Sequence, residues 1–256
     1  MNASKTRTLS RKILISCGNH MMTGFDRHRA SRSSEEVKSL KESFVQKVDD
    51  YLETLGTKLD NDSWKINIPQ SNIEIYIHPL DDHISFKHGV ERFACGLLLK
   101  QEGELCISAI FSPFFQELYF AENGRGLKRN NASVGFVEEN LISNSILTLV
   151  LPSTSSFEEA DIQVMQILAS EGSQVQITSS ALFTCARVVN GNIAAALFRV
   201  TDSNLIDLLG HIIKAAGGTL HMTEINGQPY YIASNHQIGQ HIASQLSENF
   251  ASSVKA

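Results

Sequence analysis

Cysteine is scarce in this chain. The four cysteines, Cys17, Cys95, Cys106 and Cys185, lie far apart and form no Cys-x-x-Cys pair. Three of them stand among apolar residues. Free cysteine behaves as a small buried hydrophobe, and disulfides are rare in reducing compartments. We therefore expect free thiols in a cytoplasmic protein.

Positive charge and long apolar runs are also lacking. The 22 lysines and arginines are outnumbered by 27 aspartates and glutamates, which gives a net charge of −5. A general nucleic-acid binder carries a basic surface, so we expect no nucleic-acid partner. No apolar run approaches the ~18–20 residues that a membrane span needs, so we expect no membrane segment.

The composition is that of a globular protein, with 42% hydrophobic and 19% charged residues. At 256 residues the chain is long enough to bury a sizeable core. Residues 1–32 are rich in Arg and Ser and contain a single acid, Asp26. Leu9, Ile13 and Ser16–Cys17 mark one helical face, which predicts a helix. A cleavable targeting segment and a disordered tail are the alternatives.

A second helix is predicted from residue 33 onward. Ser33 and Ser34 supply its N-cap, an apolar stripe runs from Val37 to Leu55, and Gly56 would end it. Further along, strand patterns alternate with helical ones, which indicates α/β layers. The predicted strands are 73–77, 93–99, 105–112, 117–121, 146–151, 175–177, 193–200 and 230–233, and the predicted helices are 160–169, 181–189, 203–216 and 237–250.

The strongest candidates for a functional site follow the strand 73–77. Ile73 to Gly89 reads IEIYIHPLDDHISFKHG, with two carboxylates and three imidazoles within eleven residues. Pro79 ends the strand because proline cannot donate to a ladder. A strand-to-helix corner exposes side chains and unpaired backbone N–H groups together, which suits metal or anion binding.

This corner resembles a signature of the inositol monophosphatase family of magnesium-dependent phosphatases. His78 to Phe86 reads HPLDDHISF, which shares three of nine positions with the family's Asp-Pro-Ile-Asp-Gly-Thr-Thr-Asn-Phe. Phe93–Leu99 is similar to the next core strand of the family. Gly103–Pro113 with Glu117–Leu127, Ser179–Cys185, Gly191 and Ala215–Gly218 follow in the family's order and approximate spacing, so the resemblance covers roughly residues 65–245.

The resemblance implies an αβαβα sandwich of alternating helical and sheet layers. It divides the chain into an N-terminal metal-site half, residues 1–140, and a C-terminal α/β half, residues 141–256, in one compact unit. It also implies hydrolysis of a small phosphorylated metabolite with Mg²⁺, and it allows a homodimer.

The metal ligands of the family are only partly present. Asp81 occupies the second Asp of the signature, whereas His78 replaces the first with a nitrogen ligand that suits Zn²⁺ or Mn²⁺ better than Mg²⁺. The third family Asp falls on Leu205, and Asp202 is the nearest replacement, although it also suits a helix N-cap. The Gly-Glu-Glu motif of the family is missing, and Asp60, Asp62 and Glu74 are the nearby acids.

The phosphate side of the signature is altered as well. Asp82 and His83 stand where the family has Gly-Thr, so both fall at the phosphate-site position, and His83 is the candidate catalytic residue. A carboxylate at this place repels phosphate and can accept the same N–H groups, so Asp82 is a candidate internal substitute for the ligand. The acidic sugar-binding residue of the family corresponds to Phe198.

These departures predict a family member with a degenerate Mg²⁺ site and weak or no phosphomonoesterase activity, retained as a binding or scaffold protein. One alternative is an active phosphatase acting on an inositol, sugar or nucleotide phosphate. Another is a transition-metal site formed by His78, Asp81 and His83, with His88 as a further candidate ligand.

Overall fold

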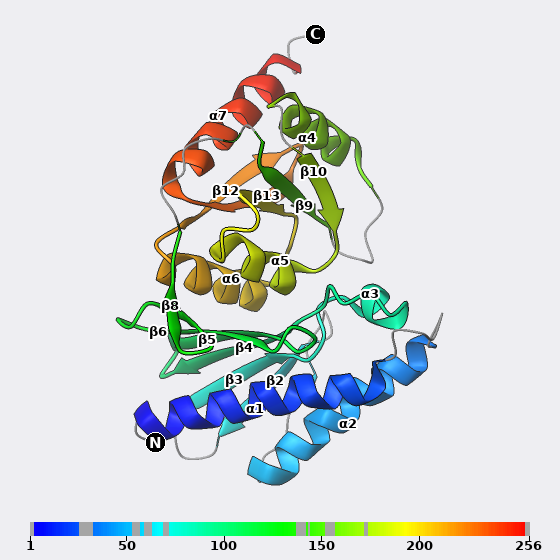
Figure 1. Cartoon of the computed structure of the whole chain (residues 1–256), viewed down its shortest axis with the longest axis vertical. Coiled ribbons are helices and arrows are strands. Elements are labelled where there is room, and N and C mark those ends of the chain that lie inside the picture. The colour runs from blue at the N-terminus through cyan, green and yellow to red at the C-terminus, as the bar shows by residue number, and fades with distance from the viewer. Residues whose placement is uncertain are drawn as a thin grey trace. The chain divides into compact units, whose positions relative to one another are not determined.

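The protein divides into two compact units, Met1–Ser133 and Val134–Ala256. The structure, a computed structural model, describes residues 3–25, 33–52, 57–58, 63–68, 72–136, 142, 144–151, 157–171 and 174–253. Each unit combines one sheet with covering helices (Figure 1). The predicted α/β class is confirmed by this arrangement.

In the described part of the first unit, eight strands form a sheet in chain order, so that each strand neighbours the next one along the sequence. The pairings from β1 to β7 are antiparallel. The strands are β1 (Thr57–Lys58), β2 (Trp64–Ile68), β3 (Ile73–His78), β4 (Cys95–Gln101), β5 (Glu104–Ser112), β6 (Glu117–Glu122), β7 (Leu127–Arg129) and β8 (Ala132–Val134).

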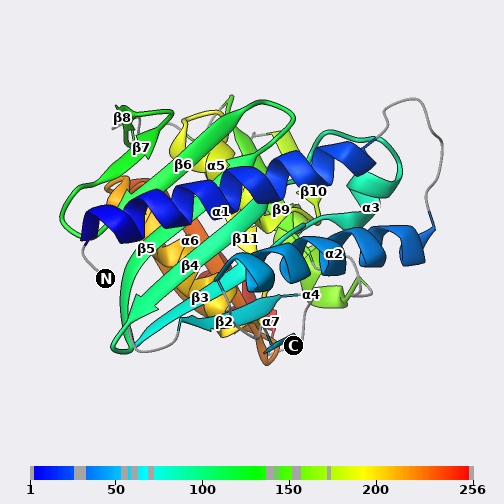
Figure 2. The ribbon, with the colours of Figure 1, turned by 90° about the horizontal axis from the view of Figure 1, so that it is seen from below.

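Two long helices, α1 (Ala3–Gly24) and α2 (Ser34–Leu52), lie side by side over one face of this sheet (Figure 2). Their apolar sides join the strands in one core that includes Leu14, Phe44 and Ile75. Gly18 lets α1 approach β5 closely, because a Cβ there would lie 2.3 Å from Cδ1 of Phe111. The short helix α3 (His83–Lys87) follows β3.

The second unit has a mixed sheet in the order β10-β9-β11-β13-β12. β10, β9 and β11 are parallel, whereas β13 runs antiparallel to β11 and β12. Helices α4 and α7 pack on one face, and α5 and α6 lie on the other (Figure 1). The bounds are β9 (Ile146–Val150), α4 (Glu159–Ser170), β10 (Gln174–Thr178), α5 (Ala181–Val189), β11 (Ala195–Phe198), α6 (Ser203–Ala215), β12 (Thr219–Ile225), β13 (Gln228–Ser234) and α7 (His236–Ser253).

The N-terminal helix is confirmed, with Ile13 and Cys17 buried as predicted. The assignment of Ser16 to the buried face is wrong, because Ser16 is exposed. The second helix is also confirmed. The N–H of Glu36 donates to Ser33 Oγ at 3.1 Å and the N–H of Ser33 donates to Glu36 Oε2 at 2.8 Å. These reciprocal bonds form a capping box. Leu55 and Gly56 lie outside the described residues.

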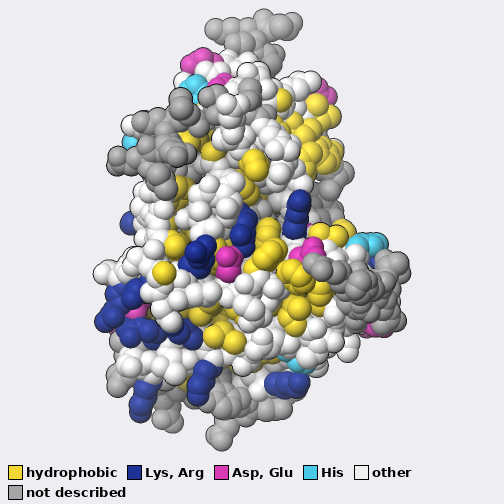
Figure 3. Space-filling view, viewed as in Figure 1, with side chains coloured by type: hydrophobic (Ala, Val, Ile, Leu, Met, Phe, Trp, Pro, Cys, Tyr) yellow, Lys and Arg dark blue, Asp and Glu magenta, His cyan; other side chains and the backbone are white. Residues whose placement is uncertain are grey.

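Lys and Arg side chains gather on the part of the first unit that carries β6 to β8 (Figure 3). In this region Arg7 of α1 donates to both carboxylate oxygens of Glu122, each at 2.7 Å. The hydrogen bond from Arg7 lowers the pKa of Glu122. Among the described helices, none combines the length and apolarity that crossing a membrane requires.

Candidate functional site

The corner between β3 and α3 lies within the first unit and carries four of the predicted site residues. His78 is the last residue of β3, and its backbone pairs with Gly96 of β4. Its side chain is buried. Asp81 and Asp82 follow in the turn, and His83 is the first residue of α3. The predicted strand-to-helix corner is therefore present.

Asp81 is clamped to the segment that leads into β4. Its carboxylate oxygen Oδ1 accepts the N–H of Ala94 at 2.8 Å, and its own N–H donates to the carbonyl of Ala94 at 3.1 Å. The side chain is half-buried. These two bonds fix the direction of the carboxylate and use one of its oxygens as a backbone acceptor.

Asp82 is the N-cap of α3 and is almost fully buried, with 1% of its surface exposed. Its Oδ1 accepts the N–H of Ser85 at 2.9 Å, and its Oδ2 accepts the hydroxyl of Ser85 at 2.7 Å. Both carboxylate oxygens thus have local donors. The carboxylate carries out the N-capping that a helix start requires from a side chain or a ligand.

Two buried thiols lie behind the corner. The S–H of Cys95 and that of Cys17 point to the carbonyl of Pro79, with Sγ–O distances of 3.0 and 3.7 Å. Burial raises the pKa of Cys95, and the nearby Cys17 and the charge of Asp81 raise it further. Structural thiols buried in apolar surroundings are inert, so we assign both cysteines to packing. Sequence spacing gave no sign of this pairing, because the two cysteines are on α1 and β4.

Asp202 belongs to the second unit, where it caps α6. Its Oδ1 accepts the N–H of Asn204 at 2.9 Å and the N–H of Leu205 at 3.3 Å. The predicted capping role is confirmed. Its metal role stays a prediction. Leu205 lies in the first turn of α6, and Phe198 is fully buried in β11.

Among the described residues, the corner supplies fewer oxygen ligands than the several that Mg²⁺ requires. The corner offers the carboxylate of Asp81, a nitrogen at His78 and a capping carboxylate at Asp82. Glu74 on β3 is engaged, since it pairs with Lys65 and accepts the hydroxyl of Tyr76 at 3.1 Å. The other nearby acids, residues 60 and 62, lie outside the described residues.

A site for another metal was predicted at His78, Asp81 and His83. Within the part of the chain that the structure describes, no three His, Cys, Asp or Glu side chains meet in a group able to hold a metal ion. The transition-metal hypothesis therefore depends on metal analysis of the purified protein.

Curated proteins similar to this chain include a Nus factor and an inositol monophosphatase. A Nus factor SuhB from Buchnera aphidicola is 26% identical over 239 residues, which cover 87% of this chain and 86% of that protein. An inositol-1-monophosphatase from Bacillus subtilis is 26% identical over 162 residues, which cover 63% of this chain and 60% of that protein.

Solved structures share the fold along nearly the whole chain. The extragenic suppressor protein SuhB of Bartonella henselae has a TM-score of 0.78 at 15% identity, covering 94% of this chain and 98% of that chain. An IMPase of Thermotoga maritima has a TM-score of 0.75 at 18% identity, covering 95% and 97%. The predicted layered α/β fold is confirmed by these likenesses. The sequence model of the inositol monophosphatase family matches residues 21–256 of this chain. This chain therefore belongs to the inositol monophosphatase family.

Proposed function

We propose that this chain is a degenerate member of the inositol monophosphatase family, with weak or no phosphomonoesterase activity, and that it acts as a binding or scaffold protein. The observation that carries the proposal is the side chain of Asp82. It is buried at the start of α3, and both of its oxygens accept hydrogen bonds from Ser85. We infer from the family resemblance that the phosphate of a substrate would lie at this position.

Charge repulsion supports the proposal. A phosphate monoester is a dianion near neutral pH, and Asp82 places a carboxylate at its position. Two unit charges about 4 Å apart near a protein surface repel by about 4 kcal/mol. That energy corresponds to a loss of affinity of roughly a thousandfold. The capping bonds of Asp82 also occupy the backbone N–H of Ser85 that the anion would otherwise approach.

The ligand chemistry supports it as well. Catalysis of phosphoryl transfer relies on positioning and on metal ions that neutralise the developing charge. His78 supplies a nitrogen where the family has a carboxylate, and Leu205 has no ligand atom. Asp81 and Asp202 both accept backbone N–H groups. Among the described residues of the corner and of the start of α6, too few hard oxygen ligands remain for a Mg²⁺ cluster.

A turnover assay tests this proposal. Purified protein is incubated with an aryl phosphate or inositol 1-phosphate and Mg²⁺, Mn²⁺ or Zn²⁺ in turn, and inorganic phosphate is measured. We expect release no faster than that of an Asp81→Asn variant. Metal-dependent release that Asp81→Asn abolishes would establish the alternative of an active phosphatase built around Asp81, with His83 as its candidate catalytic residue.

Two further parts of the proposal concern partners and location. The Buchnera relative is named a Nus factor rather than a phosphatase, which supports a role in binding. From the family resemblance we also propose a homodimer. Light scattering of the full chain should then give twice the mass of one chain. All four cysteines are free, which supports a reducing, cytoplasmic location.

A further inference from the structure

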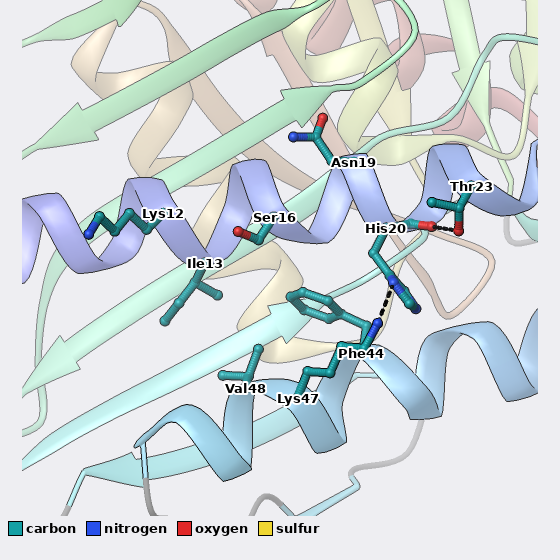
Figure 4. Close-up of a pocket in the computed structure, with 9 residues that line it drawn as sticks. All are labelled: Lys12, Ile13, Ser16, Asn19, His20, Thr23, Phe44, Lys47 and Val48. Carbon is teal, nitrogen blue, oxygen red and sulfur yellow. Dashed lines mark hydrogen bonds between the residues drawn. The ribbon is translucent and has the colours of Figure 1, made fainter.

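A groove separates α1 from α2 on the face of the first unit that these helices cover (Figure 4). It encloses a volume of about 740 Å³. Sites for small molecules range from about 300 to 1,000 Å³, so the groove is large enough for one. The lining residues are Lys12, Ile13, Ser16, Asn19, His20 and Thr23 of α1 with Phe44, Lys47 and Val48 of α2.

The groove is basic. Lys12 and Lys47 line it together with His20, and none of the lining residues that the structure describes carries a carboxylate. Helix α1 contributes no acidic side chain anywhere along Ala3–Gly24. The groove therefore favours a ligand that brings negative charge.

The ammonium group of Lys47 has a weak partner in His20. Its Nζ lies 3.3 Å from His20 Nδ1, and Nε2 of the same ring lies 2.9 Å from the hydroxyl of Ser43. Because an ammonium can only donate, Nδ1 accepts and the imidazole is neutral. Burial lowers the pKa of His20, and the charge of Lys47 lowers it further. A carboxylate is a stronger acceptor for Lys47 than a neutral imidazole.

The wall beside this polar pair is apolar. Phe44 packs against His20 with ring centroids 5.9 Å apart. Ile13 and Val48 continue the wall along the two helices with their outer edges, since only 5% and 6% of their surfaces are exposed (Figure 4). A ligand that fits both parts has a charged head and an apolar body.

We propose that the groove between α1 and α2 binds a small amphiphilic monocarboxylate. Its carboxylate lies at Lys47 and His20, and its apolar body lies along Phe44 toward Ile13 and Val48. A single negative charge suits this place, because one ammonium and one neutral imidazole face it and Lys12 adds only a further exposed cation. None of the described residues that line the groove belongs to the β3–α3 corner.

Calorimetric titration with octanoate tests the proposal, with acetate as the head alone and octanol as the body alone. We expect octanoate to bind with one-to-one stoichiometry and the other two to bind far more weakly. Lys47→Gln should weaken octanoate binding by up to about fivefold, because Lys47 is exposed and an exposed ion pair contributes about 0–1 kcal/mol. Lys38→Gln is the matched control, because Lys38 lies on the same helix, outside the groove, beside Glu35 at 3.7 Å.

A second measurement does not depend on heat. Octanoate should raise the pKa of His20, because a carboxylate stabilises the charged imidazolium. This pKa is measured by NMR, with the resonance of His20 assigned by its loss in His20→Gln. Thermal unfolding of each variant verifies that it is folded. The proposal is overturned by an absence of octanoate binding, or by equal weakening in Lys47→Gln and Lys38→Gln.

Discussion

A buried ionic network in the second unit allows the sharpest prediction of stability. Arg199 is 5% exposed and Asp161 is fully buried. The guanidinium of Arg199 lies 3.3 Å from Asp161 Oδ2 and 2.5 Å from Glu158 Oε1. Asp161 also accepts the hydroxyl of Tyr230 at 2.6 Å and the N–H of Glu158 at 2.8 Å. We predict that Arg199→Met strongly destabilises the protein, because it leaves the carboxylate of Asp161 buried without a cation.

The magnitude follows from what remains around Asp161. Breaking a buried ion pair by removing one partner costs about 3–5 kcal/mol. Asp161 keeps two hydrogen-bond donors, and the Glu158 side chain is 41% exposed and can be solvated. We therefore expect the lower end of that range, about 3 kcal/mol. Removing the charge as well, in Arg199→Met with Asp161→Asn, should recover about 1–3 kcal/mol relative to the sum of the two single changes.

Urea unfolding followed by circular dichroism measures these free energies. Lys65→Met is the control, because the Lys65–Glu74 pair is partly exposed, with side-chain exposures of 28% and 33%. Such pairs contribute about 0–1 kcal/mol. A cost of Arg199→Met no larger than that of Lys65→Met, or a double change equal to the sum of the single ones, would contradict a buried ion pair of this strength.

Three other changes have clear expected results. Arg7→Met should raise the pKa of Glu122, measured by NMR of the carboxyl group. Because that pKa is lowered in the folded state, the Arg7–Glu122 pair stabilises the fold at neutral pH and ceases to do so in acid. The stabilities of the variant and the parent should therefore converge at acid pH. The pKa of His20 is lowered mainly by burial. The folded protein therefore loses stability as the pH falls below about 6.5, the pKa of histidine in the unfolded chain. His20→Gln should flatten this part of the urea stability profile, and an unchanged slope would contradict the assignment. Gly18→Ala should destabilise the protein by about 1–3 kcal/mol in thermal unfolding, because the added Cβ would overlap the ring of Phe111. A variant more stable than the parent would show that α1 moves away from β5 at little cost.

Most elements could be predicted because their apolar periodicity matches what the fold buries. Helix 203–216 was expected and α6 spans Ser203–Ala215, with an N-cap that Asp202 signals in the sequence. The strand Thr219–Ile225 was missed. It lies at the edge of its sheet and has exposed residues in its middle, so it has no regular alternation of apolar and polar residues.

The candidate site was predicted in its residues but not in its contacts. The sequence around His78, Asp81 and Asp82, directly after a strand pattern, predicted the corner between β3 and α3. The partners of the two carboxylates, Ala94 and Ser85, are backbone and hydroxyl groups that carry no distinctive pattern. The groove between α1 and α2 was also missed, because its lysines are 35 positions apart and meet only through the packing of two helices.

The measurement that tests the central claim most directly is calorimetric titration of inorganic phosphate into the parent protein, Asp82→Gly and Asp82→Ser. Serine keeps an N-cap acceptor for α3 without the charge, so it separates repulsion from loss of the helix start. We predict no measurable phosphate binding to the parent and a gain of binding in both variants. Phosphate binding to the parent, or no gain in either folded variant, would contradict the claim that Asp82 fills the anion position.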